Sequence, residues 1–218
     1  MEKHKYLVID TETAGILEKP LVYDCGFAVV DNTGRIYEQH SYVILEVFFG
    51  MKDLMQTAYY AEKIPQYLND IDVGKRRVAR FFYVQGIINQ LCIKYNIQAI
   101  IAHNMRFDRN ALNYTTSIIS GGLKKYFLPY NVDIWCTLAM SRSLLSQRPV
   151  YRQWCEKNDF LTKYHQPRFT AEILFRFITG NMDFTESHTG LEDVLIESQI
   201  FAYCVRQHKP MQRHYWKD

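Results

Sequence analysis

The first apolar run of the chain is Tyr6-Leu7-Val8-Ile9, and an acidic pair, Asp10-Thr11-Glu12, follows it directly. Four β-prone residues in a row predict a short strand buried in a sheet. Side chains alternate between the two faces of a strand, so Asp10 and Glu12 are expected on the same face. Two carboxylates on one face can bind one cation, although a single Asp-x-Glu pair also occurs as ordinary solvated charge at a strand end.

Further strands and helices are expected on the C-terminal side of this run. Residues 22–30 predict a second strand, and the turn Asp31-Asn32-Thr33-Gly34 leads into short β-prone runs at 35–37 and 42–44. These runs predict three antiparallel strands at the start of the chain. Residues 48–72 are aromatic and irregular and predict short helices, whereas apolar residues recur at helical spacing over 78–95.

An alternation of strands and helices follows. Residues 97–102 form a continuous apolar run typical of a central strand buried on both faces, and a helix is expected at 107–119 before Gly121-Gly122. A strand is then expected at 132–135, with helices at 137–145, 170–178 and 190–206. The pattern predicts an α/β fold: a mixed sheet of three antiparallel strands and then parallel strands, flanked by helices. We expect one domain over 1–218, with a core at about 5–206 and a basic tail at 207–218.

Composition excludes several classes of protein. Of the 218 residues 48% are hydrophobic, with only 10 Gly and 6 Pro, which indicates a globular chain rather than a disordered or fibrous one. The first apolar run is too short for a signal peptide, and no later run reaches membrane-spanning length, so a soluble cytoplasmic protein is expected. The five Cys include no CxxC pair, which predicts small buried side chains rather than a zinc knuckle or disulfides.

The basic residues are clustered, although the formal net charge is only +3. One cluster is Lys75-Arg76-Arg77 with Arg80, and 206–217 is the other. Each is either a solvated face or a set of phosphate contacts. Aromatic residues near the first cluster are candidates for stacking on single-stranded bases, although a core position is the favoured role for each: Phe48, Phe49, Tyr59 and Tyr60.

Two further motifs carry acids at the start of predicted helices. Asp108 closes the run Ala102-His103-Asn104-Met105-Arg106-Phe107-Asp108, where a buried strand gives way to a helix. His188 precedes the last predicted helix, and Asp193 falls in its first turn. Taken singly, an acid at a helix N-terminus favours the helix dipole, and a histidine before a helix is a loop residue.

Together the motifs predict a catalytic metal site. Asp10, Glu12, Asp108 and Asp193 would converge on one edge of the sheet, where their charges repel unless cations neutralise them. An all-oxygen ligand set suits two Mg²⁺ (or Mn²⁺) ions rather than zinc. Two such ions about 3.5–4 Å apart form the clamp used for phosphoryl displacement. His188 would then take the proton of the attacking water.

At these residues the sequence resembles the DEDD superfamily of 3′-to-5′ exonucleases, of the DnaQ-like kind, which includes proofreading subunits, ribonuclease T and oligoribonuclease. The resemblance covers the chain from Lys5 to about Val205, with the motifs at 8–15, 102–108 and 188–193 in the family's order. It is similar to the histidine type (DEDDh), because a histidine stands five residues before Asp193 and a threonine four before it. The resemblance implies a ribonuclease H-like fold and release of nucleoside monophosphates from single-stranded DNA or RNA 3′ ends.

The resemblance also implies where the substrate binds. Thr13, Ala14 and Gly15 would lie beside the terminal nucleotide, with Ile16 or Leu17 wedged against it. Asn104 is a further candidate contact, although a hydrogen-bonding brace is the favoured role, as a core position is for Phe107. The sequence departs from the family at 47–80, which does not align, at Gly190, where many relatives have alanine, and at 147–168, a substrate-shaping insertion or extra packing.

Alternatives remain open at this point. A module on the same fold could bind nucleic acid or a polymerase partner without catalysis, and an endonuclease of the ribonuclease H kind would share the fold without needing His188. No membrane partner is expected. The sequence decides neither between DNA and RNA nor between a monomer, a homodimer and a complex with a separate polymerase chain.

Overall fold

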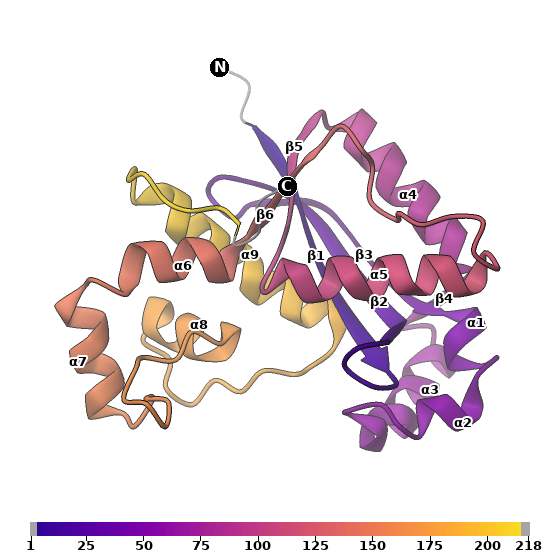
Figure 1. The fold of residues 1–218 in the computed structure, drawn as a ribbon, viewed down its shortest axis with the longest axis horizontal. Coiled ribbons are helices and arrows are strands. Elements are labelled where there is room, and N and C mark those ends of the chain that lie inside the picture. The colour runs from indigo at the N-terminus through magenta and orange to yellow at the C-terminus, as the bar shows by residue number, and fades with distance from the viewer. Residues whose placement is uncertain (1–3, 215–218) are drawn as a thin grey trace.

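A six-stranded sheet forms the centre of the protein in the computed structural model, which describes residues 4–214 (Figure 1). The strands lie in the order β4-β3-β2-β1-β5-β6. Their bounds are β1 Lys5–Ala14, β2 Leu21–Asp31, β3 Ile36–Ile44, β4 Arg77–Ala79, β5 Ile97–Ala102 and β6 Asp133–Cys136.

The strand directions confirm the predicted mixed sheet. β1, β2 and β3 are antiparallel neighbours, β5 and β6 run parallel to β1, and β4 runs parallel to β3. This is the ribonuclease H-like α/β arrangement, with β4 added at one edge. The sequence did not predict β4, because three residues are too few to show a periodic pattern.

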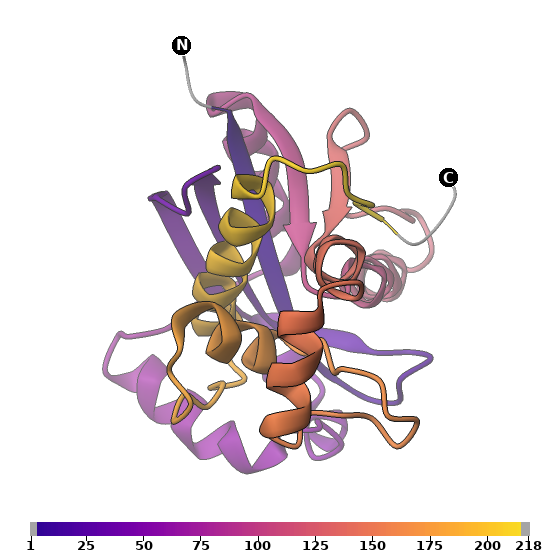
Figure 2. The ribbon, with the colours of Figure 1, turned by 90° about the vertical axis from the view of Figure 1, so that its left-hand side faces the viewer.

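Helices cover both faces of the sheet (Figures 1 and 2). Helices α4 and α5 pack on one face, and α6, α8 and α9 pack on the other, so each face has its own hydrophobic core. The bounds are α1 Leu45–Phe48, α2 Lys52–Met55, a 3-10 turn η1 Ala61–Lys63, α3 Ile64–Asp72, α4 Phe81–Lys94, α5 Met105–Ile119, α6 Thr137–Leu145, α7 Pro149–Lys157, α8 Ala171–Thr179 and α9 Gly190–Arg206.

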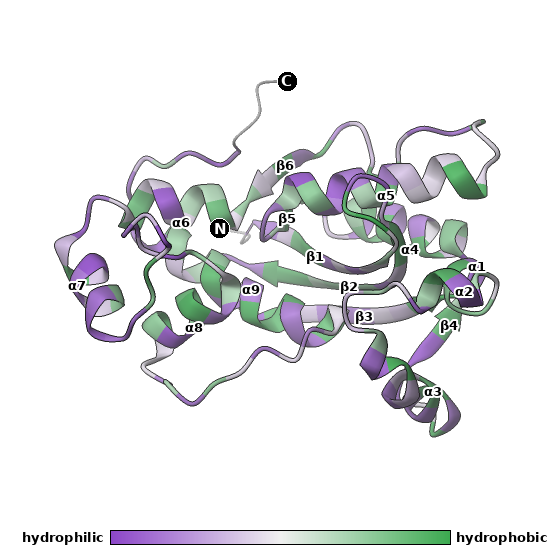
Figure 3. Cartoon of the chain, turned by 60° about the horizontal axis from the view of Figure 1, so that its bottom comes forward, coloured by the Kyte–Doolittle hydropathy of each residue, from purple (hydrophilic) through white to green (hydrophobic). Residues whose placement is uncertain are grey.

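Helix α7 lies within the 147–168 segment, for which the sequence predicted no helix. Its outer surface is polar, as the purple of α7 in Figure 3 shows. Tyr151 and Cys155 are nevertheless fully buried in the core around α9, and the rings of Trp154 and Phe160 pack beside them. Of the two roles considered for this segment, the structure shows packing.

The alternation along β1 decides which way its acids point. Leu7 and Ile9 belong to the core beneath α4 and α5, whereas Tyr6 and Val8 belong to the core beneath α9. Asp10 and Glu12 continue the second series, because the side-chain period of a strand is two. All five cysteines are buried and free, as predicted. Within residues 4–214, no helix combines the length and the apolar character needed to span a bilayer.

Two glycines allow α9 to lie directly against β2. A Cβ atom on Gly26 would come within 2.2 Å of the carbonyl carbon of Gly190, and one on Gly190 within 2.7 Å of the Gly26 nitrogen. Both contacts are with backbone, which cannot move aside as a flexible side chain can. The alanine that many DEDD relatives have at the position of Gly190 therefore does not fit this helix start.

Gly26→Ala should lower the free energy of unfolding by at least about 3 kcal/mol, the upper range for overpacking, and lower Tm by roughly 6–12 °C. Gly86 lies inside α4, and a Cβ there meets no described heavy atom within 4 Å. Gly86→Ala should therefore stabilise the protein by about 0.5–1 kcal/mol. Thermal unfolding followed by circular dichroism compares the two, and equal Tm values would contradict the close contact of β2 with α9.

Candidate active site

Three carboxylates from β1 and α9 meet above the sheet. Asp10 and Glu12 come from β1, and Asp193 comes from the first turn of α9. Their oxygen atoms lie within 4.8 Å of one another. The pairing of β1 with β2 shifts register between Glu12 and Thr13, so the ladder is irregular immediately after the two acids. The structure therefore brings together three of the four acids that the sequence singled out.

Asp108 lies beside this group but outside it. It belongs to the first turn of α5, and its Oδ1 accepts hydrogen bonds from the backbone nitrogen of Thr11 (3.2 Å) and from Thr11 Oγ1 (2.9 Å). These two bonds attach the start of α5 to β1 between Asp10 and Glu12. Although its oxygens are not within the 4.8 Å group, the charge of Asp108 raises the pKa of Asp10.

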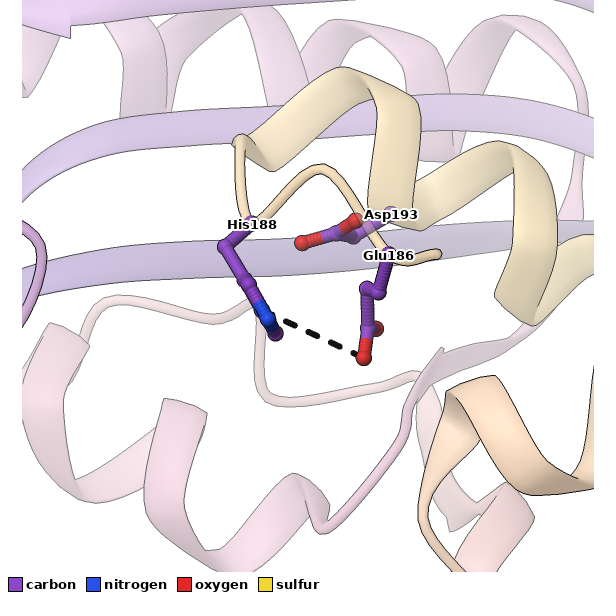
Figure 4. A group of neighbouring side chains, drawn as sticks. All are labelled: Glu186, His188 and Asp193. Carbon is purple, nitrogen blue, oxygen red and sulfur yellow. Dashed lines mark ion pairs between the residues drawn. The ribbon is translucent and has the colours of Figure 1, made fainter. Parts of the chain in front are cut away.

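His188 adjoins the third acid of the group. Its ring, Glu186 and Asp193 form a second set of potential ligands whose atoms lie within 4.8 Å of one another. Figure 4 shows the His188 ring facing Glu186, with 4.0 Å between His188 Nδ1 and Glu186 Oε2, and the Asp193 carboxylate directed from α9 toward the same space. His188 has a φ of 50°, a left-handed conformation that places its side chain on this side of the loop.

The 47–80 segment, which the sequence could not align with the family, holds His188 in place. The ring of Tyr60 stacks on the His188 ring with 4.3 Å between centroids and 13° between planes. Lys63 Nζ donates hydrogen bonds to the carbonyl oxygens of Ser187 and His188. From the sequence, Tyr60 was a candidate for stacking on bases. Its contact with His188 could not be predicted, because residues 60 and 188 are far apart in the sequence.

Two further acids belong to the site, and the sequence reasoning missed both. Glu186 stands two residues before His188. Glu197 follows Asp193 by four residues on α9, so the two project from one face of the helix. Its side chain is buried, and Glu197 Oε2 has no hydrogen-bond partner among the described residues, nor has Asp193 Oδ1. An acid four residues after Asp193 in an otherwise apolar stretch was the signal available in the sequence.

Burial and mutual repulsion raise the pKa values of the clustered acids. Burial is the largest cause of the raised pKa at Asp10, followed by the charges of Glu197 and Asp108. Burial and the charge of Asp24 raise the pKa of Glu12 to about 8. Burial and the charge of Glu186 raise the pKa of Asp193 to about 8, and burial raises that of Asp108 to about 7.

These observations fit a divalent cation. The site has hard carboxylate oxygens from several elements, two of them buried without a partner, and a repulsion that positive charge would relieve. Asp10, Glu12 and Asp193 are the residues that could hold such an ion, with Asp108 and Glu186 at its margins. The donor set resembles those that bind Mg²⁺ or Mn²⁺.

The free energy of unfolding of the metal-free protein should fall as pH rises from 6.5 to 8.5. Glu12, Asp108 and Asp193 have folded-state pKa values of about 7–8, above their ordinary values of 3.8–4.5, so the folded state binds more protons in this range. Burial lowers the pKa of His103 to about 4 from its ordinary value of 6.5, so this one group opposes the fall only in the lower part of the range, against three acids.

Cation binding should oppose this fall, because it favours the ionised carboxylates. At a concentration near 100 Kd a cation adds about 2.7 kcal/mol, or roughly 5–10 °C in Tm. Thermal unfolding at several pH values in EDTA and in Mn²⁺ measures both effects. A metal-free Tm that stays level across the range would show that the acids are not clustered as described.

A buried polar network fixes α9 to β2 behind the site. Asp24 Oδ2 accepts hydrogen bonds from Tyr67 Oη (2.6 Å) and from the backbone nitrogen of Gly190 (3.2 Å). Arg76 forms ion pairs with Asp24 (3.4 Å) and Asp70 (3.0 Å), and its side chain is buried. Of the two roles left open for the cluster at 75–80, a solvated face and a set of phosphate contacts, neither applies to Arg76, which is enclosed with acids that balance its charge.

The residues implied to contact substrate follow Glu12 in the chain, but the side chain of one of them, Ala14, is fully buried in the core and is not available to a nucleotide. Thr13 and Ala14 end β1, and Gly15, with a φ of 98°, donates from its nitrogen to Thr57 Oγ1 at 3.0 Å. Ile16 and Leu17 follow in the β1–β2 connection and are 63% and 80% exposed. Large apolar side chains at a loop tip are available to contact a ligand.

Neither Asn104 nor Phe107 has the structural role that the sequence favoured, a hydrogen-bonding brace for Asn104 and a core position for Phe107. Asn104 is exposed, with a φ of 65°, and its side chain makes no capping hydrogen bond to α5, so the predicted brace is not present at the helix start. Phe107 is half-buried rather than part of either core. His103, left unassigned from sequence, places its ring nitrogens 2.9 Å from Thr137 Oγ1 and 2.8 Å from the Phe169 carbonyl oxygen.

Solved structures share this fold. Neither a protein-family model nor a curated protein sequence matches the chain. It is similar to E. coli exonuclease I in a zinc-bound complex with single-stranded DNA (TM-score 0.62, 15% identity), covering 94% of this chain and 42% of that one. It is also similar to a full-length 3′-exonuclease (TM-score 0.58, 11% identity, 98% and 86% covered). A third is cell-death related nuclease 4, CRN-4 (TM-score 0.52, 10% identity, 94% and 64% covered).

These similarities establish the class of fold. The chain shares the ribonuclease H-like fold of these solved nucleases, which is the fold that the sequence resemblance implied. It spans less than half the length of the exonuclease I chain.

Proposed function

We propose that this chain is a metal-dependent 3′-to-5′ exonuclease that releases nucleoside monophosphates from single-stranded DNA or RNA. The observation that carries the proposal is the meeting of Asp10, Glu12 and Asp193 within 4.8 Å, with His188 against Asp193 in a second such group. The similarity in fold to exonucleases supports it.

Each side chain of the site has a part in the proposed reaction. Asp10, Glu12 and Asp193, with Asp108 beside them, would hold two Mg²⁺ or Mn²⁺ ions, whose positive charge would neutralise the acids and stabilise the charge developing on the phosphate. His188 accepts the proton of the attacking water. Burial and the charge of Lys63 lower the pKa of His188, which favours the neutral ring that can accept a proton. Tyr60 and Lys63 position the ring and its loop.

The terminal nucleotide binds at the end of β1. Thr13 and Gly15 offer a small surface and backbone groups beside the fully buried Ala14, while Ile16 or Leu17 contacts the last base. Asn104 contributes from the start of α5, where its side chain is exposed and has no capping role. If Ile16 or Leu17 inserts between the last base and its neighbour, only one nucleotide reaches the carboxylates and is released at a time.

Degradation of end-labelled oligomers tests the proposal. The 5′-labelled single-stranded DNA and RNA of one sequence are incubated in Mg²⁺, in Mn²⁺ and in EDTA, beside a circular single strand that has no end. We expect a ladder shortening from the 3′ end that requires the cation, an intact circle, and nucleoside monophosphates as products. Cleavage of the circle would indicate an endonuclease, and binding without degradation would indicate a non-catalytic module.

A further inference from the structure

A second concave surface lies on the far side of α5 from the carboxylates. We call it the α5–β6 groove; its volume is about 900 Å³, within the range typical of ligand sites. Its walls are α5, the loop before β6, the strand β6 and the segment after α9. The side chains that matter here are Arg106, Arg109, Tyr126, Tyr130, Trp135 and Arg213.

The groove is basic. Arg106 and Arg109 stand three residues apart and share one face of α5, and Arg213 joins them from the opposite wall. Asp133 is the one acid among the lining residues. Asp108, two residues after Arg106, points to the other side of α5, where it is bonded to Thr11. The positive charge of the groove is therefore not neutralised by the carboxylate cluster.

Exposed aromatic rings lie among these cations. Tyr126 is 58% exposed and Tyr130 is 88% exposed, with 6.2 Å between their ring centroids. On the β6 wall, the guanidinium of Arg213 lies 4.0 Å from the ring centroid of Trp135, which is itself buried, so the exposed rings are those of the two tyrosines. Flat rings beside guanidinium groups are the pattern that binds single-stranded nucleic acid, because bases stack on the rings while the cations contact phosphates.

The loop that carries the tyrosines is held in place. Phe127 is buried, with 4.7 Å between its ring centroid and that of Phe81. Gln85 Nε2 donates to the carbonyl oxygens of Tyr126 (3.2 Å) and Phe127 (2.7 Å), and the Phe127 nitrogen donates to Asn113 Oδ1 (3.0 Å). Tyr126 thus projects from an anchored backbone, so binding at this wall requires little ordering of the chain.

The opposite wall is attached to the edge of the sheet. The backbone nitrogen of Cys136 donates to the carbonyl oxygen of Arg213 at 2.6 Å, and the nitrogen of Gln212 donates to Ser143 Oγ at 3.1 Å. The segment after α9 is thereby fixed beside β6, with Arg213 over Trp135. Of the basic tail predicted at 207–218, residues 215–218 lie outside the described residues.

We propose that the α5–β6 groove is a second binding site for single-stranded nucleic acid, which holds part of the strand whose 3′ end reaches the carboxylates. Its arginines contact phosphates, and its tyrosines stack on bases. An acidic peptide would pair with the arginines but would leave the exposed rings unused. The identity of the bound strand as the substrate rests on the proposed function. Binding at the groove itself needs neither a cation nor cleavage.

Binding in EDTA tests the groove without catalysis. The probe is a fluorescein-labelled single strand of about 15 nucleotides, within the range of such sites, and fluorescence anisotropy gives Kd. Arg109→Ala with Tyr130→Ala should weaken binding about 10-fold or more, by loss of one phosphate contact and one stacking partner. The slope of log K against log salt should become shallower by about 0.7 for the lost contact. The matched control is Arg152→Ala with Tyr164→Ala, both exposed and remote from the groove.

The outcomes separate this proposal from the proposed function. The proposed binding site would be overturned by a Kd of the groove variant within twofold of wild type. It would also be overturned by a wild type that does not bind the strand in EDTA. Equal loss in the control variant would do the same. Weakened binding in the groove variant alone supports it, and photo-crosslinking of a strand containing 4-thiouridine to Tyr126 or Tyr130 would locate it. If such binding accompanies no degradation by wild type in Mg²⁺ or Mn²⁺, the groove stands and the exonuclease fails.

Discussion

Asp10→Asn should lower the rate of cation-dependent nucleotide release by at least about 10³-fold, because a catalytic cation supplies several kcal/mol and each 1.36 kcal/mol is tenfold in rate. Asp10 is in the group with Glu12 and Asp193, and an amide there is a weaker ligand that carries no charge. The same change should raise the Tm of the metal-free protein, since it removes a buried carboxylate that Glu197 and Asp108 repel.

The opposite signs make the prediction specific. Single-turnover degradation and thermal unfolding in EDTA measure the two effects on one preparation. Asp183→Asn is the matched control, because Asp183 is exposed on the loop before His188 and should change neither quantity. A variant that loses activity and stability together would indicate a structural role for Asp10 instead of cation binding.

His188→Ala should lower kcat by about 10²–10⁴-fold, the usual contribution of a general base, with little change in KM. The ring contacts Tyr60 and faces Glu186, so its removal leaves the carboxylates of Asp10 and Glu12 in place. Cation affinity, measured by the rise of Tm with Mn²⁺ concentration, should therefore be close to that of wild type.

His208 provides the control for this variant. It is exposed, and its φ of 50° equals that of His188, so His208→Ala makes the same change at the same backbone conformation away from the site. Tyr60→Ala should lower kcat less than His188→Ala, because it frees the ring without removing it. A loss of cation affinity in His188→Ala equal to its loss of rate would identify His188 as a ligand rather than a base.

Elements with a long periodic pattern could be predicted from the sequence. The apolar run at 97–102 and the helical pattern before Gly180 appear in the structure as β5 and α8. The helix expected from 78 begins instead at Phe81, because Arg77–Ala79 pairs with β3 as β4. β4 pairs with β3, which lies more than thirty residues earlier in the chain. A strand of three residues has no sequence pattern that would predict such a non-local pairing.

The residues of the candidate site likewise divide into those that the sequence could predict and those that it could not. Asp10, Glu12, Asp108, His188 and Asp193 stand in motifs that sequence alone can locate. The structure gathers Asp10, Glu12 and Asp193, places His188 against Asp193, and bonds Asp108 to Thr11 beside them. Tyr60 and Lys63 could not be found, because their role depends on a contact across more than 120 residues. Arg76 looked like a phosphate contact in a basic run, but the acids that enclose it, Asp24 and Asp70, are its neighbours only in the fold.

The location of α9 has a consequence for the cell during synthesis of the protein. Glu12 and Asp193 are 181 residues apart in the chain, so at 5–20 residues per second roughly 10–40 s separate their synthesis. Until α9 leaves the ribosome and docks on β2 through Gly26, the three carboxylates cannot meet. Under the proposed function, a nascent chain is therefore harmless to the messenger RNA that encodes it.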